Sequence, residues 1–445
     1  MNPLDAVTNR ERESETTGLR HPDSASGNYP HARHRELVVH ALILTGVALA
    51  ARLAFLAWLP AGAYSADVDK WLEVDRVLQA GGNPYNVTDH LNWPPFWMQV
   101  VFAIGWLARA SAVPFVAVLR TVLIAVELSA ILLVYALLTR VTSPRSAFWL
   151  VLIGVALNPV AILLICQHGN FDIFVATFIL LALQRLLRFA ERDEPVDWLW
   201  ACAFVGLGVL AKTVPAVLVP LLAFRINRLR WSERLLGALL LVGPVVLGTS
   251  IVYTLGPMQV TANVLHYRSY PGWFGITGVL QLAGFSDGGA LYRRGFALSV
   301  LILLAALFIA AARQRNAGTE QLVLFALGPL AAVPGLGPGY SPQYITWFVM
   351  LLPVAFAATS SRWLRTSIPV FLSIAAVTYV IEYAMFTSHG SFWVRLHPTA
   401  PLLATSVRWS TQAGQTRVRL PLFGAWLWLL ATVFARAIQL TRHSR

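Results

Sequence analysis

The chain has 445 residues, of which 57% are hydrophobic and only 12% are charged. Because a soluble domain carries about 25% charged residues, this composition excludes an ordinary soluble enzyme and indicates a protein that spans a lipid bilayer. The formal net charge is +13, but the basic residues lie mostly in short gaps between apolar runs. That distribution indicates the positive-inside pattern of a membrane protein and not nucleic-acid binding. Both cysteines, Cys166 and Cys202, lie in or beside apolar runs, which indicates neither a disulfide framework nor a metal cluster.

The first 36 residues are polar, lack the apolar core of a signal peptide, and are predicted to form a disordered cytoplasmic tail (residues 1–36). Residues 37–440 are predicted to form one all-α transmembrane domain, because apolar runs of about 20 residues can cross a bilayer. We expect about twelve spans, near residues 37–59, 115–138, 147–165, 172–188, 197–211, 213–224, 235–255, 296–312, 320–335, 343–359, 366–386 and 421–439. The runs 197–211 and 213–224 are shorter than a full crossing, so they form either one long bent element or two short helices.

Residues 93–110 are apolar enough to pass for another span, but charge argues against a crossing. If this segment crossed, the arginine-rich gaps that follow it would face outward. If it lies along the outer surface, all of these gaps fall on one side, and the positive-inside rule places both termini in the cytoplasm. The extracytoplasmic segments are then expected at 60–114, 166–171, Lys212, 256–295, 336–342 and 387–420.

The first outer loop is unusually rich in carboxylates. Five of the 21 acidic residues of the chain lie between positions 67 and 89. Asp67 and Asp69 directly follow the first span, where a carboxylate loses hydration unless it is paired or faces a water-filled cavity. They belong either to a hydrated loop face or to a functional site, as a general base or a metal-binding pair. Nearness to the bilayer raises a carboxylate pKa, which suits a base that takes a proton from a hydroxyl group.

The stretch "NPVAILLICQHGNFDIF" closes one span and opens the next. Asn158 and Pro159 predict a kink in the first of these spans. His168, Asn170 and Asp172 crowd a very short outer turn, where Asp172 is also a natural N-cap for the next helix. The turn is therefore either a capped connection or one wall of a site.

Cations occur in two other outer segments. Lys212, in "VLAKTVPAVLVPLL", lies between apolar runs, where a lysine usually has an anionic partner such as a phosphate. The chain has one other lysine, Lys70, also on the outer side, and compact ammonium groups suit anion binding. The stretch "NVLHYRSYPGWFGITG" carries His266 and Arg268, and Arg268 either pairs a phosphate bidentately or belongs to an interfacial aromatic loop.

The stretch "GYSPQYITWFVMLLPV" enters the tenth expected span with Gln343 and Tyr344 on its outer turn. These side chains either line a pocket or anchor the helix at the membrane interface. The sequence contains no P-loop, no GxSxG element followed by a catalytic triad, and no HExxH element. All the candidate residues are expected on one side of the membrane.

Together the motifs resemble the GT-C superfamily of polyprenyl-phosphate-sugar glycosyltransferases, and most closely the catalytic subunit of the first GPI mannosyltransferase and its bacterial relatives. "DVDKWLEVDRVLQAGGNPY" is similar to the family's first-loop DxD element, and "NPVAILLICQHGNFDIFVA" to its Asn-Pro span followed by Gly-Asn-x-Asp. "GLGVLAKTVPAVLVPLL" is similar to its Lys-x-x-Pro segment, and "SPQYITWFVMLLPV" to its Gln-Tyr-x-x-Trp span. The four motifs occur in the family's order and cover most of residues 37–360.

The resemblance implies a GT-C-type membrane bundle that moves one sugar, expected to be mannose, with inversion, from a polyprenyl-phosphate donor to an extracytoplasmic glycolipid or glycan acceptor. It implies that Asp69 is the base and that Asp67 supports it. The residues expected to bind the donor phosphate are Lys212, His266 and Arg268. The residues expected to form the sugar and acceptor pocket are His168, Asn170, Asp172, Gln343 and Tyr344. A divalent cation such as Mg²⁺ or Mn²⁺ is left open, because two carboxylates alone do not fill its coordination shell.

Two other interpretations stand beside this one. The first is a twelve-span secondary transporter, in which Glu127 or Glu382 would be the membrane-embedded acid. Transporters are commonly built from repeated halves, and this chain shows no internal repeat. Acids that meet at the outer boundary would favour the transferase, and acids at the midplane the transporter. The second alternative is a catalytically inactive scaffold with the same fold.

Overall fold

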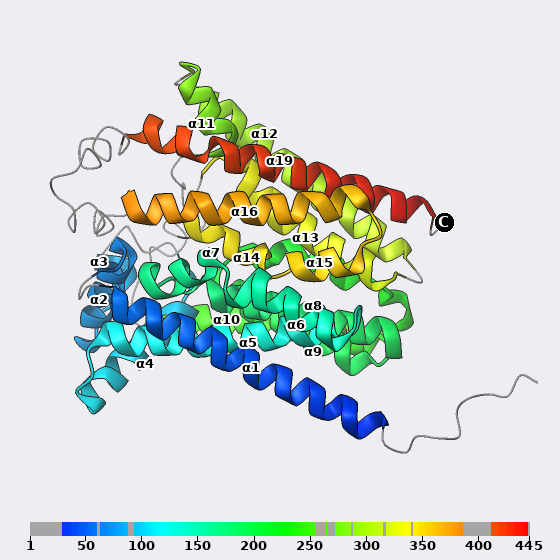
Figure 1. The fold of residues 1–445 in the computed structure, drawn as a ribbon, viewed down its shortest axis with the longest axis horizontal. Helices are drawn as coiled ribbons and strands as arrows, with labels where there is room; N and C mark the ends of the chain where they lie inside the picture. Colours follow the sequence, from blue (N-terminus) through cyan, green and yellow to red (C-terminus); the bar gives the residue numbers. More distant parts are fainter. Residues whose placement is uncertain are drawn as a thin grey trace, which may run out of the picture.

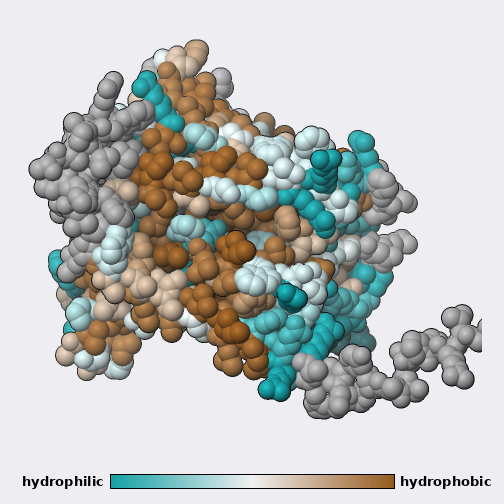
Figure 2. All heavy atoms as spheres, viewed as in Figure 1, coloured by the Kyte–Doolittle hydropathy of each residue, from teal (hydrophilic) through white to brown (hydrophobic). Residues whose placement is uncertain are grey.

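The computed structural model describes residues 29–59, 63–87, 93–253, 264, 272–285, 288–314, 317–339, 341–385 and 411–443. Within these ranges every regular element is helical, which confirms the predicted all-α polytopic fold. The long helices run side by side along the long axis of the molecule (Figure 1). A wide band of hydrophobic side chains covers the middle of the bundle, as expected for a surface in contact with lipid (Figure 2).

Eight helices of the described chain are long and apolar enough to cross a membrane. They are α1 (Tyr29–Trp58), α5 (Phe115–Leu138), α8 (Asp172–Arg192), α10 (Trp231–Tyr253), α12 (Gly288–Arg313), α13 (Thr319–Leu336), α16 (Arg362–Met385) and α19 (Gln412–His443). A bent pair, Pro144–Ala156 and Pro159–His168, makes a ninth if it is counted as one span. Three shorter apolar stretches, α9 (Pro195–Ala211), η3 (Val214–Ala223) and Pro342–Ala358, occupy the remaining expected positions.

The boundaries differ from the predicted ones in a few places. Helix α1 begins at Tyr29 and α19 at Gln412, so both are longer than their apolar runs. The uncertain region around Lys212 forms two elements, the α-helix α9 and the 3-10 helix η3, and not one long bent helix. Helix α4 (Phe96–Ser111) is not among the candidate spans, and it packs beside α2 (Ala66–Gln79).

The predicted kink at Asn158 and Pro159 is confirmed. The two halves of this span, α6 (Pro144–Val151) with η1 (Leu152–Ala156), and α7 (Pro159–Ile162) with η2 (Leu163–His168), meet at an angle of 48°. Proline cannot donate a backbone hydrogen bond inside a helix, but it is well suited to the first position of a new one. The Asn158 side chain caps this new helix by accepting from the Val160 backbone N–H at 2.9 Å.

The two ends of the bundle differ in charge and in composition. Helix α1 begins and α19 ends at the same end, whereas α2 and α3 (Pro84–Val87) lie at the other (Figure 1). Hydrophilic side chains gather at the end where α19 terminates (Figure 2). We call this the arginine-rich end, because its turns carry Arg140, Arg145, Arg188, Arg192, Arg225, Arg228, Arg313, Arg362, Arg365 and Arg442. The opposite end is called the α2 end.

Close packing and buried ion pairs hold the bundle together. Gly206 of α9 allows α10 to approach, since a Cβ there would lie 2.4 Å from the backbone carbonyl oxygen of Leu241. Arg52 of α1 binds Glu127 of α5 through two hydrogen bonds, at 2.9 Å and 2.6 Å, and both side chains are fully buried. Arg52 also donates to the backbone carbonyl of Ala156, beside the kink. One side chain therefore joins α1, α5 and the bent span.

Candidate active site

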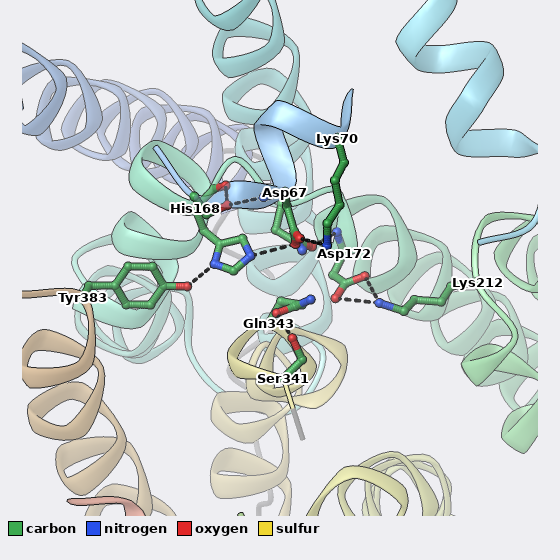
Figure 3. A network of polar contacts seen from close by, with 10 residues as sticks. Asp67, Lys70, His168, Asp172, Lys212, Ser341, Gln343 and Tyr383 are labelled. Atoms are coloured by element: carbon green, nitrogen blue, oxygen red, sulfur yellow. Dashed lines mark hydrogen bonds and ion pairs between the residues drawn. The ribbon is translucent and has the colours of Figure 1, made fainter. Parts of the chain in front are cut away.

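Polar side chains from five separate parts of the chain meet at the α2 end (Figure 3). They come from the start of α2, the turn between η2 and α8, the residue after α9, the η6 turn (Pro342–Ile345), and the last turns of α16. All five places are helix ends, and polar side chains at the end of a membrane helix avoid the cost of burial in hydrocarbon. The carboxylates of this group thus gather at one boundary of the bundle.

The start of α2 is fixed against the turn that precedes α8. Ser65 is the N-cap of α2: its Oγ accepts from the Asp67 backbone N–H at 3.3 Å and donates to the His168 carbonyl at 2.7 Å. Gly169 has a φ of +70°, and a Cβ on it would lie 2.7 Å from a methyl carbon of Val68. Only glycine permits both this left-handed turn and the close contact with α2.

Asp67 lies at the centre of a hydrogen-bonded network. Its Oδ2 is 3.1 Å from His168 Nε2, and its Oδ1 accepts from Lys70 Nζ at 3.3 Å. Burial favours a higher pKa for Asp67, but the hydrogen bond and charge of His168, together with Lys70, hold that pKa well below its usual value. Asp67 is therefore an ionised carboxylate at neutral pH, and the expectation of a raised pKa near the bilayer is wrong for this residue.

The network continues from His168 to Tyr383. The Tyr383 hydroxyl is hydrogen-bonded to His168 Nδ1, and its ring is buried. Because an ionised carboxylate only accepts hydrogen bonds, His168 Nε2 must carry the proton that faces Asp67. When the ring is neutral, Nδ1 accepts from the tyrosine hydroxyl, which fixes the tautomer. When the ring is protonated and places its charge beside Asp67, Nδ1 donates to the tyrosine oxygen, so Tyr383 orients the imidazole in both forms.

Asp172 and Lys212 form a second pair beside the first. Asp172 begins α8, but the prediction that it is an N-cap is wrong: Phe171 occupies that position, and Asn170 Oδ1 accepts the Asp172 backbone N–H at 2.7 Å. The Asp172 carboxylate instead accepts two hydrogen bonds from Lys212 Nζ, at 2.8 Å and 3.1 Å. The anionic partner expected for Lys212 is therefore an aspartate of the same chain.

Aromatic rings surround the Lys212 ammonium group. Its nitrogen is 5.4 Å from the centre of the Phe171 ring, 5.2 Å from Tyr344 and 5.0 Å from Trp347. Tyr344 and Trp347 stack on each other with their centres 4.4 Å apart. Cation–π attraction thus adds to the ion pair in holding this lysine at one place. The neighbouring Gln343 is buried, accepts from the Ser341 hydroxyl, and lies between the two ion pairs (Figure 3).

The structure brings together most of the residues predicted for the site. The residues in or beside the network are Asp67, His168, Asn170, Asp172, Lys212, Gln343 and Tyr344. Asp69 lies on another side of α2, where it is exposed. Burial raises the pKa of its neighbour Tyr64, and the Asp69 carboxylate raises it further. His266 and Arg268 lie outside the described residues.

The sequence did not identify the partners of two members of the network, Lys70 and Tyr383. Lys70 follows Asp67 by three positions, which is a helical ion-pair spacing that could have revealed it. Tyr383 is 215 positions from His168 and carries no local signal. Among the described residues, no group of three His, Cys, Asp or Glu side chains is placed to hold a metal ion, so no ligand set is assigned to a divalent cation.

Comparison with known proteins gives a family match over part of the chain. Residues 95–253 match the family model of the dolichyl-phosphate-mannose-protein mannosyltransferases. The matched stretch includes His168, Asp172 and Lys212, while Asp67 and Tyr383 lie outside it. No curated protein sequence matches the chain. As the motifs predicted, the match supports membership of this chain in the GT-C superfamily of membrane glycosyltransferases.

Proposed function

We propose that the protein transfers one sugar, expected to be mannose, from a polyprenyl-phosphate carrier to a glycolipid or glycan acceptor outside the cytoplasm. The family match supports sugar transfer by a membrane enzyme. The observation that carries the proposal is the meeting of Asp67, His168, Asp172 and Lys212 at one end of the bundle. A lipid-linked donor presents its sugar and phosphate at such a membrane boundary.

The proposed orientation rests on the charge of the two ends. Under the positive-inside rule, the arginine-rich end faces the cytoplasm. Both the start of α1 and the end of α19 lie at that end (Figure 1). The α2 end, with the carboxylates, then faces the extracytoplasmic side of the cell membrane.

We place proton removal on Asp67, with Asp69 supporting it from the exposed rim. The sequence resemblance favours Asp69, but Asp67 is the carboxylate that lies inside the network, and position comes before pKa in choosing a base. The acceptor hydroxyl gives its proton to Asp67 as its oxygen attacks the anomeric carbon. The bond from that carbon to the phosphate oxygen breaks in the same displacement, which inverts the anomeric centre.

The leaving phosphate needs cationic partners, because negative charge grows on it as the bond breaks. We assign this role to Lys212, His266 and Arg268. Lys212 has three N–H donors and uses two of them on Asp172, so one remains for a phosphate oxygen. The sugar and acceptor pocket is proposed to consist of His168, Asn170, Asp172, Gln343 and Tyr344.

The proposal is tested by supplying purified protein with polyprenyl-phosphate mannose and, separately, its glucose and arabinose counterparts. A membrane extract that contains candidate acceptors is added, and donor consumption is followed. We expect mannose transfer that is lost in the Asp67→Asn variant. Consumption of none of the three donors would contradict the transferase proposal, and consumption of another donor would correct the sugar.

The Tyr383–His168–Asp67 chain predicts a shift in pH dependence. Replacing Tyr383 with Phe removes the hydroxyl that holds the His168 ring toward Asp67, so the ionised form of Asp67 loses part of its stabilisation and the pKa of Asp67 rises. Because the base works only when ionised, the acidic limb of the kcat/KM profile should move to higher pH, by about one unit. His168→Asn should move the limb in the same direction.

Tyr379→Phe is the matched control. Tyr379 lies one turn earlier on α16, and its hydroxyl donates to the Pro342 carbonyl and not to His168. Its pH profile should therefore keep the wild-type limb, even if its rate falls. If Tyr383→Phe slows transfer without moving the limb, then the hydroxyl acts only in packing.

A further inference from the structure

An apolar groove lies between α12, α13 and α19, toward the arginine-rich end. Its volume is about 330 Å³. Its walls include Leu303, Ala306 and Ala310 of α12, Pro329 of α13, and Phe434 and Ala437 of α19. All three helices are candidate spans, so the groove opens where hydrocarbon surrounds the protein. In that setting a lipid chain, and not water, is the natural occupant.

The length of the groove confines it to one leaflet. Its lining extends from Leu303 to Ala310 on α12 and from Phe434 to Arg442 on α19. At 1.5 Å per residue each wall is about 10–12 Å long, which is less than half of the roughly 30 Å hydrocarbon core. The groove therefore does not reach the α2 end, where the sugar donor is proposed to bind.

Two arginines mark the outer rim of the groove. Arg442 lines it, and Arg313 is the last residue of α12, one turn beyond Ala310 and on the same helical face. Neither forms an ion pair with another residue in the described parts of the chain. By contrast, Arg436 of α19 is held by Glu320 through hydrogen bonds of 2.7 Å and 3.0 Å. The rim thus offers unpaired positive charge next to an apolar channel.

We propose that this groove binds an acidic glycerophospholipid of the leaflet at the arginine-rich end. One acyl chain lies between α12 and α19, and the headgroup phosphate pairs with Arg313 and Arg442. Basic pockets between transmembrane helices suit anionic headgroups in this way. A zwitterionic lipid fills the same groove less favourably, because its own cation opposes the arginines. This binding does not depend on the proposed sugar transfer.

Native mass spectrometry of the full-length protein tests the proposal. Dioleoyl phosphatidylglycerol and dioleoyl phosphatidylcholine are titrated separately, so that only the headgroup differs. We expect one tightly retained phosphatidylglycerol and weaker phosphatidylcholine. The Arg313→Gln, Arg442→Gln double variant should bind phosphatidylglycerol about 30-fold more weakly, at roughly fivefold per arginine. Ala306→Trp fills the groove and should reduce the binding of both lipids.

The control carries Arg145→Gln and Arg362→Gln, which remove two exposed arginines of the same end that do not line the groove. It should bind phosphatidylglycerol as the wild type does. Equal weakening in the control would show that net charge alone attracts the lipid, and would overturn the site. Equal retention of the two lipids by the wild type would also overturn it. So would displacement of phosphatidylglycerol by equimolar polyprenyl phosphate, which would assign the groove to the carrier.

Discussion

Replacing Asp67 with Asn is expected to reduce sugar transfer by about 10²–10⁴-fold, the usual contribution of a positioned acid–base group. Asparagine has nearly the same shape, and its carbonyl can still accept a hydrogen bond from His168 or Lys70. It cannot take a proton from the acceptor hydroxyl. The loss should therefore appear in kcat with little change in thermal unfolding, measured by transfer of labelled sugar from a saturating lipid-linked donor.

Asp69→Asn is the matched control for this experiment. The two carboxylates are two positions apart on α2, but Asp69 is exposed and lies outside the network around His168. We expect less than a tenfold loss of activity from this change. The opposite ranking, with Asp69→Asn inactive and Asp67→Asn active, would return the base to the residue that the sequence resemblance favours.

Replacing Glu127 with Ala is expected to destabilise the fold by about 3–5 kcal/mol, because it leaves Arg52 buried without its counter-charge. Removing both partners, with Arg52→Leu and Glu127→Leu, should cost less. The double variant should be less stable than the wild type by about 1–3 kcal/mol, because the Ala156 carbonyl at the kink then loses the donor that Arg52 supplies. Thermal unfolding in detergent of the single and double variants measures the difference.

The same variants bear on the transporter alternative. Glu127 is paired with Arg52, and Glu382 with Arg419 at 3.2 Å and 2.5 Å, so each acid named for a transporter has a structural cation beside it. We expect the folded double variant to retain sugar transfer. A double variant that is as unstable as Glu127→Ala would contradict the account of the pair. A folded double variant that loses all activity would give Glu127 a role in function.

Hydropathy and proline chemistry were sufficient to predict most of the fold. The apolar runs have the right positions, and the Asn158–Pro159 kink follows from the missing backbone donor of proline. The ends of α1 and α19 were harder to predict, because a helix continues beyond the membrane wherever its polar residues tolerate helical structure. Tyr29 and Gln412 lie in such polar extensions.

The site was predictable in its residue types and less so in its pairings. A lysine between apolar runs requires an anion, but the sequence could not show that Asp172, 40 positions away, supplies it. The choice between Asp67 and Asp69 depends on the helical phase of α2, which is fixed by the Ser65 cap. Tyr383 could be identified as a member of the site only from the packing of α16 against η2.

The short elements next to the site have a consequence for access. Helix α9 has 17 residues, so it is about 25 Å long, whereas the hydrocarbon layer is about 30 Å thick. A helix of this length that starts at one membrane surface ends about 5 Å short of the other, which places Lys212 below the rim of the bilayer, where its ion pair with Asp172 replaces hydration. If the proposed carrier binds here, its phosphate meets Lys212 from within the bilayer edge, while its tail remains among the lipids.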